Sequence, residues 1–348
     1  MAKVDRRQFM AGGAGLSLAA SAGIALAAPA EPPARAARPA AAKSPQEIRQ
    51  ALTGPISSIS TPFLKTGEID YPGLRKFIDV SIEGGSKTIL LTAGDSHYIC
   101  MSDDEIAEVT KVACSHTAGR AMVVAADRYY STARAIAFAT FARAQGADVY
   151  MSLPPDWGGS GTSETLADHY VELAEHTPLM IVTGPFISRG SDFGLKTIEL
   201  ALAKSKNVVA VKDDFCGEFA RRLCLKFHDR CALFAGGMKE NHMNMYPYGV
   251  DGYMSTFISI APAVANRYWK AIERKDLATA VKIIKEIDNP LFEYVGKLPG
   301  GFDAGMHGVR ELYGVGTRWR RKPYYSLSDA EMEGLRAFLA TLDIPRPT

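Results

Sequence analysis

From residue 55 onward, short apolar runs alternate along the chain with longer segments whose apolar residues recur every three or four positions. The runs are apolar at consecutive positions, as in Thr88-Ile89-Leu90-Leu91 and Val208-Val209-Ala210-Val211. Consecutive apolar residues are typical of parallel strands that are covered on both faces of their sheet. The pattern predicts strands at 55–61, 87–93, 120–126, 147–153, 178–183, 207–212, 231–235 and 250–255. It predicts helices at 71–84, 102–115, 132–144, 163–176, 194–204, 216–228, 239–248 and 260–273.

Strict alternation of eight strands with eight helices predicts an α/β fold, a (β/α)8 TIM barrel. The alternative is a doubly wound open sheet, but the G-x-G-x-x-G turn of dinucleotide-binding sheets does not follow the first predicted strand. Helical patterns continue at 276–296, 304–314 and 328–341. We therefore expect the barrel over residues 49–275 and a C-terminal helical extension packed on it over residues 276–348.

Residues 1–28 have the pattern of an export signal. Arg6 and Arg7 precede a weakly apolar, Gly/Ala-rich stretch that ends in small residues, as at a signal-peptide cleavage site. The arginine pair favours the twin-arginine route. The alternative is a membrane anchor, which needs about 20 strongly apolar residues, and Gly12, Gly13 and Ser17 weaken that case.

The Pro/Ala-rich residues 29–48 are expected to form a linker, because such a composition buries too little apolar surface to fold. We expect a mature protein in the periplasm, a precursor recognised by the twin-arginine export machinery, and no stable membrane insertion after cleavage. No later apolar stretch approaches membrane-spanning length.

The 348 residues are 47% hydrophobic and 22% charged with a net charge of +2, which is ordinary for a globular protein. Apart from the basic run 318–322, the sequence has no stretch in which basic residues alternate with aromatic residues. Nucleic-acid binding therefore has little support. Five cysteines have no C-x-x-C spacing, which makes a metal site from them improbable. They are expected to be core thiols, with a disulfide as the alternative in an oxidising compartment.

Chemistry in such barrels lies at the carboxyl ends of the strands, and these ends are polar here. In strand 207–212 a period of two places Val208, Ala210, Lys212 and Asp214 on one face. A lysine inside a barrel is costly unless it is paired or used. Burial favours the neutral amine, which attacks carbonyls, so Lys212 is a candidate nucleophile. The alternative is a structural lysine paired with Asp213 or Asp214.

Several stretches resemble the dihydrodipicolinate synthase/N-acetylneuraminate lyase family. Ser60-Thr61-Pro62-Phe63 and the following 67–71 resemble its opening strand, and Gly84-Gly85 with Ser102-Asp103-Asp104-Glu105 resembles its second strand and helix. Residues 207–213 resemble the segment that holds its Schiff-base lysine, and 249–255 with Ala261-Pro262 resemble its eighth strand and helix. The resemblance covers about 290 residues in the same order. It implies that Lys212 attacks the ketone of pyruvate or a related 2-oxo acid, and that the iminium acts as an electron sink.

The chain departs from the family pattern at the proton relay. Aligned on Pro185, the position of the family's proton-shuttling tyrosine is Val182, which cannot transfer a proton. The family's carboxylate-binding G-T-T-G-E loop aligns with residues 93–97, Ala-Gly-Asp-Ser-His, without either threonine. A tyrosine pair after the fourth strand becomes Asp156-Trp157, and Arg189 aligns near the arginine that binds the substrate carboxylate.

We therefore predict two sets of site residues at the strand ends. The catalytic set is Lys212, Asp95, His97 and Tyr130. The substrate-binding set is Gly94, Ser96, Asp127, Trp157, Arg189, Asp214 and Ser255. Tyr129 and Tyr130 have an alternative role in packing at a subunit interface. We expect no bound cofactor and no metal.

The predicted function is a Schiff-base-forming lyase, an aldolase, synthase or dehydratase, that acts on pyruvate or another 2-oxo acid. A sugar acid suits an exported protein better than the substrates of lysine biosynthesis. One alternative is a barrel that binds a small molecule without turnover. Another is a metal-dependent enzyme in which Asp95, Asp127, Asp156 and Asp214 hold Mg²⁺, Mn²⁺ or Ca²⁺. The resemblance also implies a homodimer or homotetramer.

Overall fold

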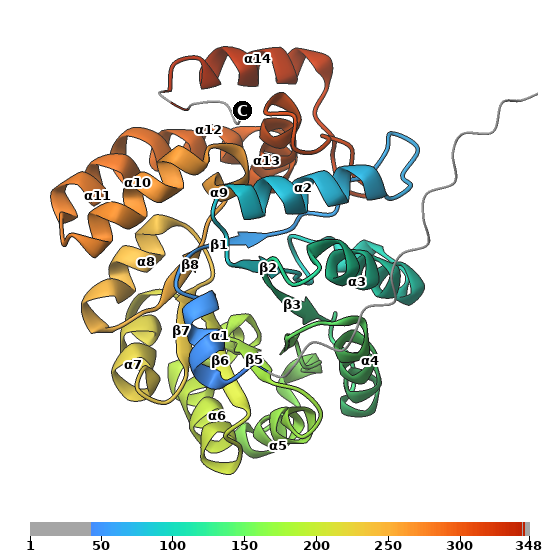
Figure 1. The fold of residues 1–348 in the computed structure, drawn as a ribbon, viewed down its shortest axis with the longest axis vertical. Helices are drawn as coiled ribbons and strands as arrows, with labels where there is room; N and C mark the ends of the chain where they lie inside the picture. The colour runs from blue at the N-terminus through green and yellow to red at the C-terminus, as the bar shows by residue number, and fades with distance from the viewer. Residues whose placement is uncertain (1–42, 343, 345–348) are drawn as a thin grey trace, which may run out of the picture. The chain divides into compact units, whose positions relative to one another are not determined.

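Eight parallel strands close into a barrel in chain order in the computed structural model, which describes residues 43–342 and 344 (Figure 1). This confirms the (β/α)8 TIM barrel. The strands are β1 Gly54–Ser58, β2 Thr88–Leu90, β3 Met122–Ala126, β4 Val149–Ser152, β5 Leu179–Val182, β6 Val208–Asp213, β7 Ala232–Ala235 and β8 Gly252–Met254. The predicted export signal and most of the predicted linker, residues 1–42, lie outside the described residues.

A helix follows each strand and covers the outside of the barrel. These helices are α2 Tyr71–Glu83, α3 Asp103–Thr117, α4 Thr132–Gln145, α5 Ser163–Ala174, α6 Ser191–Lys204, α7 Gly217–Phe227, α8 Lys239–Met245 and α10 Pro262–Glu273, with the short α9 Phe257–Ile260 before α10. Local sequence sets their starts. At α3, for example, the Ser102 side chain accepts from the Glu105 amide while the Glu105 side chain accepts from the Ser102 amide.

One helix was not expected. Helix α1, Pro45–Ala51, begins inside the Pro/Ala-rich segment assigned to the linker, and a Ser44–Glu47 capping box starts it. It lies across one end of the barrel in Figure 1 and packs against β6 and β7. Arg49 on this helix donates to the backbone oxygens of His228 and Cys231, just before β7. The amino-terminal end of the barrel is therefore covered, and the carboxyl ends of the strands face the opposite side.

Strand register determines which side chains fill the interior. Ser58 of β1 pairs with Leu90 of β2, and both side chains face the barrel interior. The residues paired with them on the following strands face the interior as well. These interior positions are Val124, Val149, Met151, Met180, Ala210 and Phe234. Their alternate neighbours face the helices. Lys212 follows Ala210 by two residues and therefore lies on the interior face of β6.

The segment after residue 275 forms the expected helical extension. It contains α11 Leu277–Ile283, a π-helical turn Ile284–Asp288, α12 Asn289–Lys297, α13 Gly301–Leu312 and α14 Asp329–Leu339. A buried ion pair joins it to the barrel, because the Lys239 ammonium donates to both oxygens of Asp288 at 2.6 and 2.8 Å. Glycines let α13 pack closely: a Cβ on Gly305 would lie 2.5 Å from that of Val295, and a Cβ on Gly308 would lie 2.7 Å from Leu327 Cδ1. Within residues 43–342 and 344, no helix combines the length and apolarity required to span a bilayer.

Candidate active site

Lys212 lies at the carboxyl end of β6, beside Val182 of β5 and Phe234 of β7 in the strand register. Its side chain is buried, and the ammonium donates a hydrogen bond to Asp214 Oδ1. Space around the amine is limited, because a Cβ on Gly236 would lie 2.8 Å from the Lys212 Nζ and would overlap the Asp214 carboxylate. An enclosed amine next to a carboxylate has the groups that imine formation requires: a nucleophile and an acceptor for its proton.

The neighbouring Asp213 faces the opposite way and has a structural role. Its carboxylate accepts from Thr183 Oγ1 at 3.0 Å and from the amides of Phe215 and Cys216 at 3.1 Å. Thr183 in turn accepts from the Asp214 amide at 2.8 Å. Burial raises the pKa of the Asp213 carboxyl. This network holds the end of β6, so Asp214, and not Asp213, is the partner of Lys212.

Asp95 lies on the other side of the barrel mouth. Its carboxylate accepts from Ser58 Oγ at 2.7 Å, and Ser58 faces the barrel interior. Ser96 fixes the loop, because its hydroxyl donates to the Ile59 oxygen at 2.6 Å and accepts from the Thr92 amide at 3.0 Å. Ser96 therefore stabilises the loop, and its side chain does not face the mouth of the barrel. In a closed ring of eight strands, β2 and β6 lie opposite one another, so Asp95 and Lys212 approach the mouth from opposite sides.

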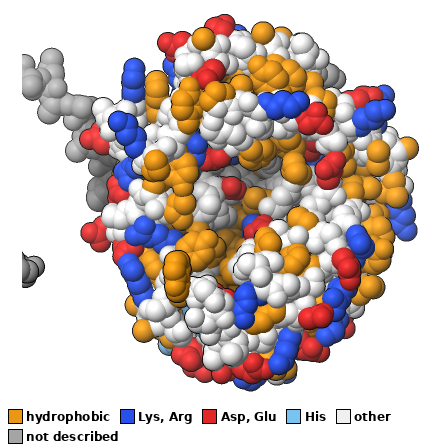
Figure 2. All heavy atoms as spheres, turned by 180° about the vertical axis from the view of Figure 1, so that it is seen from behind, with side chains coloured by type: hydrophobic (Ala, Val, Ile, Leu, Met, Phe, Trp, Pro, Cys, Tyr) orange, Lys and Arg blue, Asp and Glu red, His pale blue; other side chains and the backbone are white. Residues whose placement is uncertain are grey.

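Figure 2, seen from behind Figure 1 and thus toward the carboxyl ends of the strands, shows a central hollow with acidic side chains inside it. Gly94 borders open space, since a Cβ built on it would meet nothing within 4 Å. The hollow is the place where a substrate can reach the end of β6.

His97 is buried and turned toward α13. Its Nε2 lies 3.0 Å from the Nε2 of His307, whose Nδ1 is 3.1 Å from the Thr317 oxygen. Burial, aided by the nearby Arg320 and Arg310, lowers the pKa of His97 to about 4. The structure therefore places His97 between the β2 loop and the helical extension, away from Lys212. His97 itself has a left-handed backbone conformation, with φ of 60°, which sets the direction of its side chain.

Among the described residues, one group has metal-ligand spacing: His97, Asp303 and His307. Asp303 Oδ1 lies 3.6 and 3.9 Å from the two histidine Nε2 atoms. Two imidazoles and a carboxylate suit a transition metal. However, Arg320 forms an ion pair with Asp303, and a second arginine, Arg310, also lowers the pKa of both histidines. The positive charges of Arg310 and Arg320 oppose the binding of a metal cation beside them, so we assign no metal to this group.

Asp127 and Tyr130 are engaged in the protein interior, contrary to the predicted roles at the mouth. Asp127 accepts from the Tyr150 hydroxyl at 2.7 Å and the Leu153 amide at 3.0 Å, on the face of the sheet that packs against the helices. Burial raises the pKa of Asp127 to about 7. Tyr130 donates to Asp103 Oδ1 at 2.7 Å. Both residues follow β3, but their side chains turn outward from the barrel.

The predicted rim residues have other partners. Arg189 forms an ion pair with Asp156 and donates to the Gly161 oxygen at 2.9 Å, so its guanidinium is committed to the rim. Trp157 beside them is 92% exposed. Ser255 follows Tyr253 by two residues, on the face of β8 that points away from the interior. The four strand-end aspartates proposed as metal ligands are therefore dispersed.

Sequence reasoning missed Ser58, Gly236 and Arg310. Ser58 and Gly236 lie two residues beyond Ile56 and Phe234 on the interior face of their strands, so the period of two could have indicated them. Arg310 comes from α13, and only the folded chain brings it near Asp95. All five cysteines are free thiols; Cys114, Cys224 and Cys231 are buried, as expected of core thiols, whereas Cys100 and Cys216 are half-buried.

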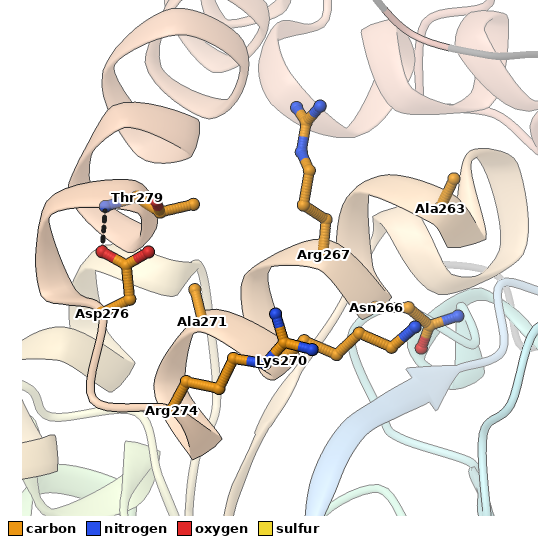
Figure 3. Close-up of a pocket in the computed structure, with 8 residues that line it drawn as sticks. All are labelled: Ala263, Asn266, Arg267, Lys270, Ala271, Arg274, Asp276 and Thr279. Carbon is orange, nitrogen blue, oxygen red and sulfur yellow. Dashed lines mark hydrogen bonds between the residues drawn. The ribbon is translucent and has the colours of Figure 1, made fainter.

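A separate cavity of about 470 Å³ lies on the outside of the barrel between α10 and α11 (Figure 3). Three exposed basic residues, Arg267, Lys270 and Arg274, line it together with Asp276, which accepts from the Thr279 amide at 3.0 Å. It contains none of the predicted site residues. The candidate active site is therefore the barrel mouth, because the buried amine and its carboxylate are there.

Comparison with known proteins places these observations in context. A model of the Dihydrodipicolinate synthetase family matches residues 51–342. An "Uncharacterized DapA-like lyase" of Rhizobium meliloti is 27% identical over 303 residues, covering 85% of this chain and 97% of that protein. A "Probable 5-dehydro-4-deoxyglucarate dehydratase 2" of Streptomyces coelicolor is 24% identical over 300 residues, covering 85% and 92%. The crystal structure of dihydrodipicolinate synthase from Oceanobacillus iheyensis has the same fold, with a TM-score of 0.74 at 20% identity over 86% of this chain and 99% of that one.

Proposed function

Because the chain belongs to the dihydrodipicolinate synthetase family, we propose that it is a Schiff-base-forming lyase in which Lys212 attacks the ketone of a 2-oxo acid. The observation that carries the proposal is the buried Lys212 amine at the carboxyl end of β6, in contact with the Asp214 carboxylate. Among residues 43–342 and 344, Asp214 is the acid that forms an ion pair with this amine.

Asp214 accepts a proton from the Lys212 ammonium, and the neutral amine adds to the ketone carbon. The resulting carbinolamine loses water as a proton is returned to its hydroxyl, which leaves an iminium. The positive iminium accepts the electron pair of a C–C or C–H bond at the adjacent carbon and becomes an enamine. In aldol cleavage the C–C bond breaks in this step and the other fragment leaves as a carbonyl compound. In dehydration the adjacent carbon loses a proton, and the enamine then expels the hydroxyl of the next carbon, which leaves as water once it is protonated. Hydrolysis of the iminium regenerates the lysine.

A second group must carry the proton that the family tyrosine carries elsewhere. Val182 occupies that position beside Lys212 and has no proton to transfer. His97 and Tyr130 are bound to His307 and Asp103. Asp95 remains: it lies at the mouth, and Ser58 holds its carboxylate. We propose Asp95 as the general acid–base group for the substrate.

We propose aldol cleavage or dehydration of a sugar acid as the reaction. The similarity to a probable sugar-acid dehydratase supports this choice, as does the loss of both loop threonines and the tyrosine. Arg6-Arg7 and the apolar stretch after them support export to the periplasm by the twin-arginine route. Replacing both arginines with lysines is expected to retain the precursor in the cytoplasm; a periplasmic product from that variant would contradict the proposal.

A screen of 2-oxo acids with cyanoborohydride, followed by the intact mass of the protein, tests the function. The proposal predicts a stable adduct with at least one 2-oxo acid. A barrel that only binds would give no adduct with any of them while calorimetry still detects binding, and that result would overturn the proposal.

A further inference from the structure

Arg310 on α13 is a buried cation without an ionic or hydrogen-bonding side-chain partner among the described residues. Only 8% of the residue is exposed, and its Nε has no hydrogen-bond acceptor. Across residues 43–342 and 344, the guanidinium forms neither an ion pair nor a hydrogen bond. Its guanidinium lies over the ring of Phe77, with Cζ 5.6 Å from the ring centroid. A buried charge is strongly unfavourable unless it is paired, so an unpaired guanidinium indicates that its partner is a ligand.

The other arginines around the carboxyl ends of the strands are already engaged. Arg128 and Arg189 bind Asp103 and Asp156, and Arg320 and Arg321 bind Asp303 and Glu105. An anionic substrate that enters the mouth would need to break one of these ion pairs to use those residues. Arg310 can accept an anion without losing any contact.

Arg310 follows His307 by three residues on α13, and His307 contacts His97 of the β2 loop, so this face of α13 lies against the β2 side of the barrel. Burial lowers the pKa of Arg310 to about 10, and the carboxylate of Asp95 opposes this shift. The guanidinium is therefore protonated at neutral pH. Asp95 is bound to Ser58, which faces the barrel interior. Lys212 is on β6, which lies opposite β2 in the closed barrel.

We propose that Arg310 binds the second carboxylate of a 2-oxo dicarboxylic acid whose ketone reacts with Lys212. This inference rests on the proposed function and narrows its substrate class. The carboxylate next to the ketone stays beside Lys212, because a single bond joins it to the reacting carbon. An anion on the β2 side must therefore be at the far end of an extended chain. The planar guanidinium matches a carboxylate with two parallel hydrogen bonds.

Binding of matched acids tests the proposal. Oxaloacetate, 2-oxoglutarate and 2-oxoadipate are each compared by calorimetry with the 2-oxo monocarboxylic acid of the same chain length. Measurements in the Lys212→Ala chain, which forms no imine, separate this test from the test of the lysine. We expect at least one dicarboxylate to bind more tightly than its partner. Arg310→Gln should weaken that dicarboxylate about 10- to 100-fold and leave the monocarboxylate unchanged.

Arg310→Lys provides a second variant that keeps the buried charge but loses the forked geometry, and it should weaken only the dicarboxylate, by a smaller factor. If Arg310→Gln does not fold, the Arg310→Lys variant provides the test. If the variants bind the dicarboxylate and the monocarboxylate more weakly by the same factor, Arg310 only stabilises Asp95, and the proposal is overturned. A chain that prefers none of the three dicarboxylates would overturn it as well. Failure of the lysine chemistry alone would appear as missing adducts with the binding preference intact.

Discussion

The Lys212 ammonium donates a hydrogen bond to the Asp214 carboxylate, two residues further along the same interior face of the barrel. The two groups meet where β6 ends, and the outward-facing Asp213 and Thr183 hold that end in place. The candidate nucleophile and its proton acceptor therefore come from one short stretch of chain. Groups for the substrate come from the opposite side of the mouth.

Asp214→Asn should slow imine formation, because the amide cannot accept the proton of the ammonium. General acid–base groups contribute about 10²- to 10⁴-fold to rate, and we expect a loss in that range. The measurement is the initial rate of adduct formation under cyanoborohydride with the 2-oxo acid found by the screen. Cys216→Ser is the control and should match the unmodified protein, because serine keeps a donor toward the Asp214 backbone oxygen and leaves the Asp214 carboxylate in place. An unchanged rate in Asp214→Asn would exclude Asp214 as the acceptor.

Gly236→Ala should slow formation of the adduct on the order of 10²-fold. The added methyl group would overlap the Asp214 carboxylate and lie 2.8 Å from the Lys212 Nζ, which displaces the amine. A misplacement of about 1 Å at a reacting group costs on the order of 10²-fold in rate. Gly237→Ala is a matched control one residue away, since a Cβ there meets nothing within 4 Å. Equal trapping by the two variants would show that the space beside Lys212 is unimportant.

Asp95→Asn should separate the two stages of the reaction. Trapping should persist, because Asp95 does not contact Lys212, whereas turnover should fall by about 10²- to 10⁴-fold if Asp95 carries the substrate proton. Tyr130→Phe is the comparison: it removes only the hydrogen bond to Asp103, so turnover should be retained. Steady-state rates and trapping on the same samples provide the measurement. The assignment fails if Tyr130→Phe loses turnover and Asp95→Asn retains it.

Asp127 should reduce stability as the pH rises. Burial raises its pKa to about 7, above the 3.8 of the free group, so the folded chain holds one more proton than the unfolded chain between these values. Stability from this group is present below pH 3.8 and falls by up to about 1.4 kcal/mol per pH unit as the pH rises toward 7.

The buried histidines His97, His169 and His242 act in the opposite direction, because burial lowers their pKa values below 6.5. The informative quantity is therefore the difference between the unmodified protein and Asp127→Asn in urea unfolding at several pH values. That difference should shift in favour of Asp127→Asn as the pH rises from about 4 to 7. A difference that does not depend on pH would mean that Asp127 ionises normally.

The barrel could be predicted from sequence because its strands are buried on both faces, which produces continuous apolar runs such as 208–211. Lys212 could be predicted because it interrupts such a run at its carboxyl end. The same period of two argues against Asp127, since Val123 and Ala125 before it face the helices; a position at a strand end does not by itself direct a side chain toward the mouth. Helix α1 begins with a capping box at Ser44 and Glu47, but the Pro/Ala-rich composition around it indicated a linker and not a helix.

The environment of the β2 loop could not be predicted in this way. His97 and Asp95 are two residues apart, yet one contacts His307 and the other contacts Ser58. His307 is 210 positions from His97 in the chain, and no local pattern records such a contact. Loop side chains follow from backbone conformation, here the left-handed His97, and from the docking of α13.

The most direct test of the central claim is the location of the trapped adduct. The protein is reduced with cyanoborohydride in the presence of the 2-oxo acid found by the screen, digested and mapped by mass spectrometry. The account predicts an added mass of one substrate less one oxygen atom, on the peptide that contains Lys212, and no adduct in Lys212→Ala. Lys239 is the internal control, since it is also buried and also paired with an aspartate, but it lies on α8 and not on a barrel strand. An adduct on Lys239 or another lysine, or one that persists in Lys212→Ala, would contradict the account.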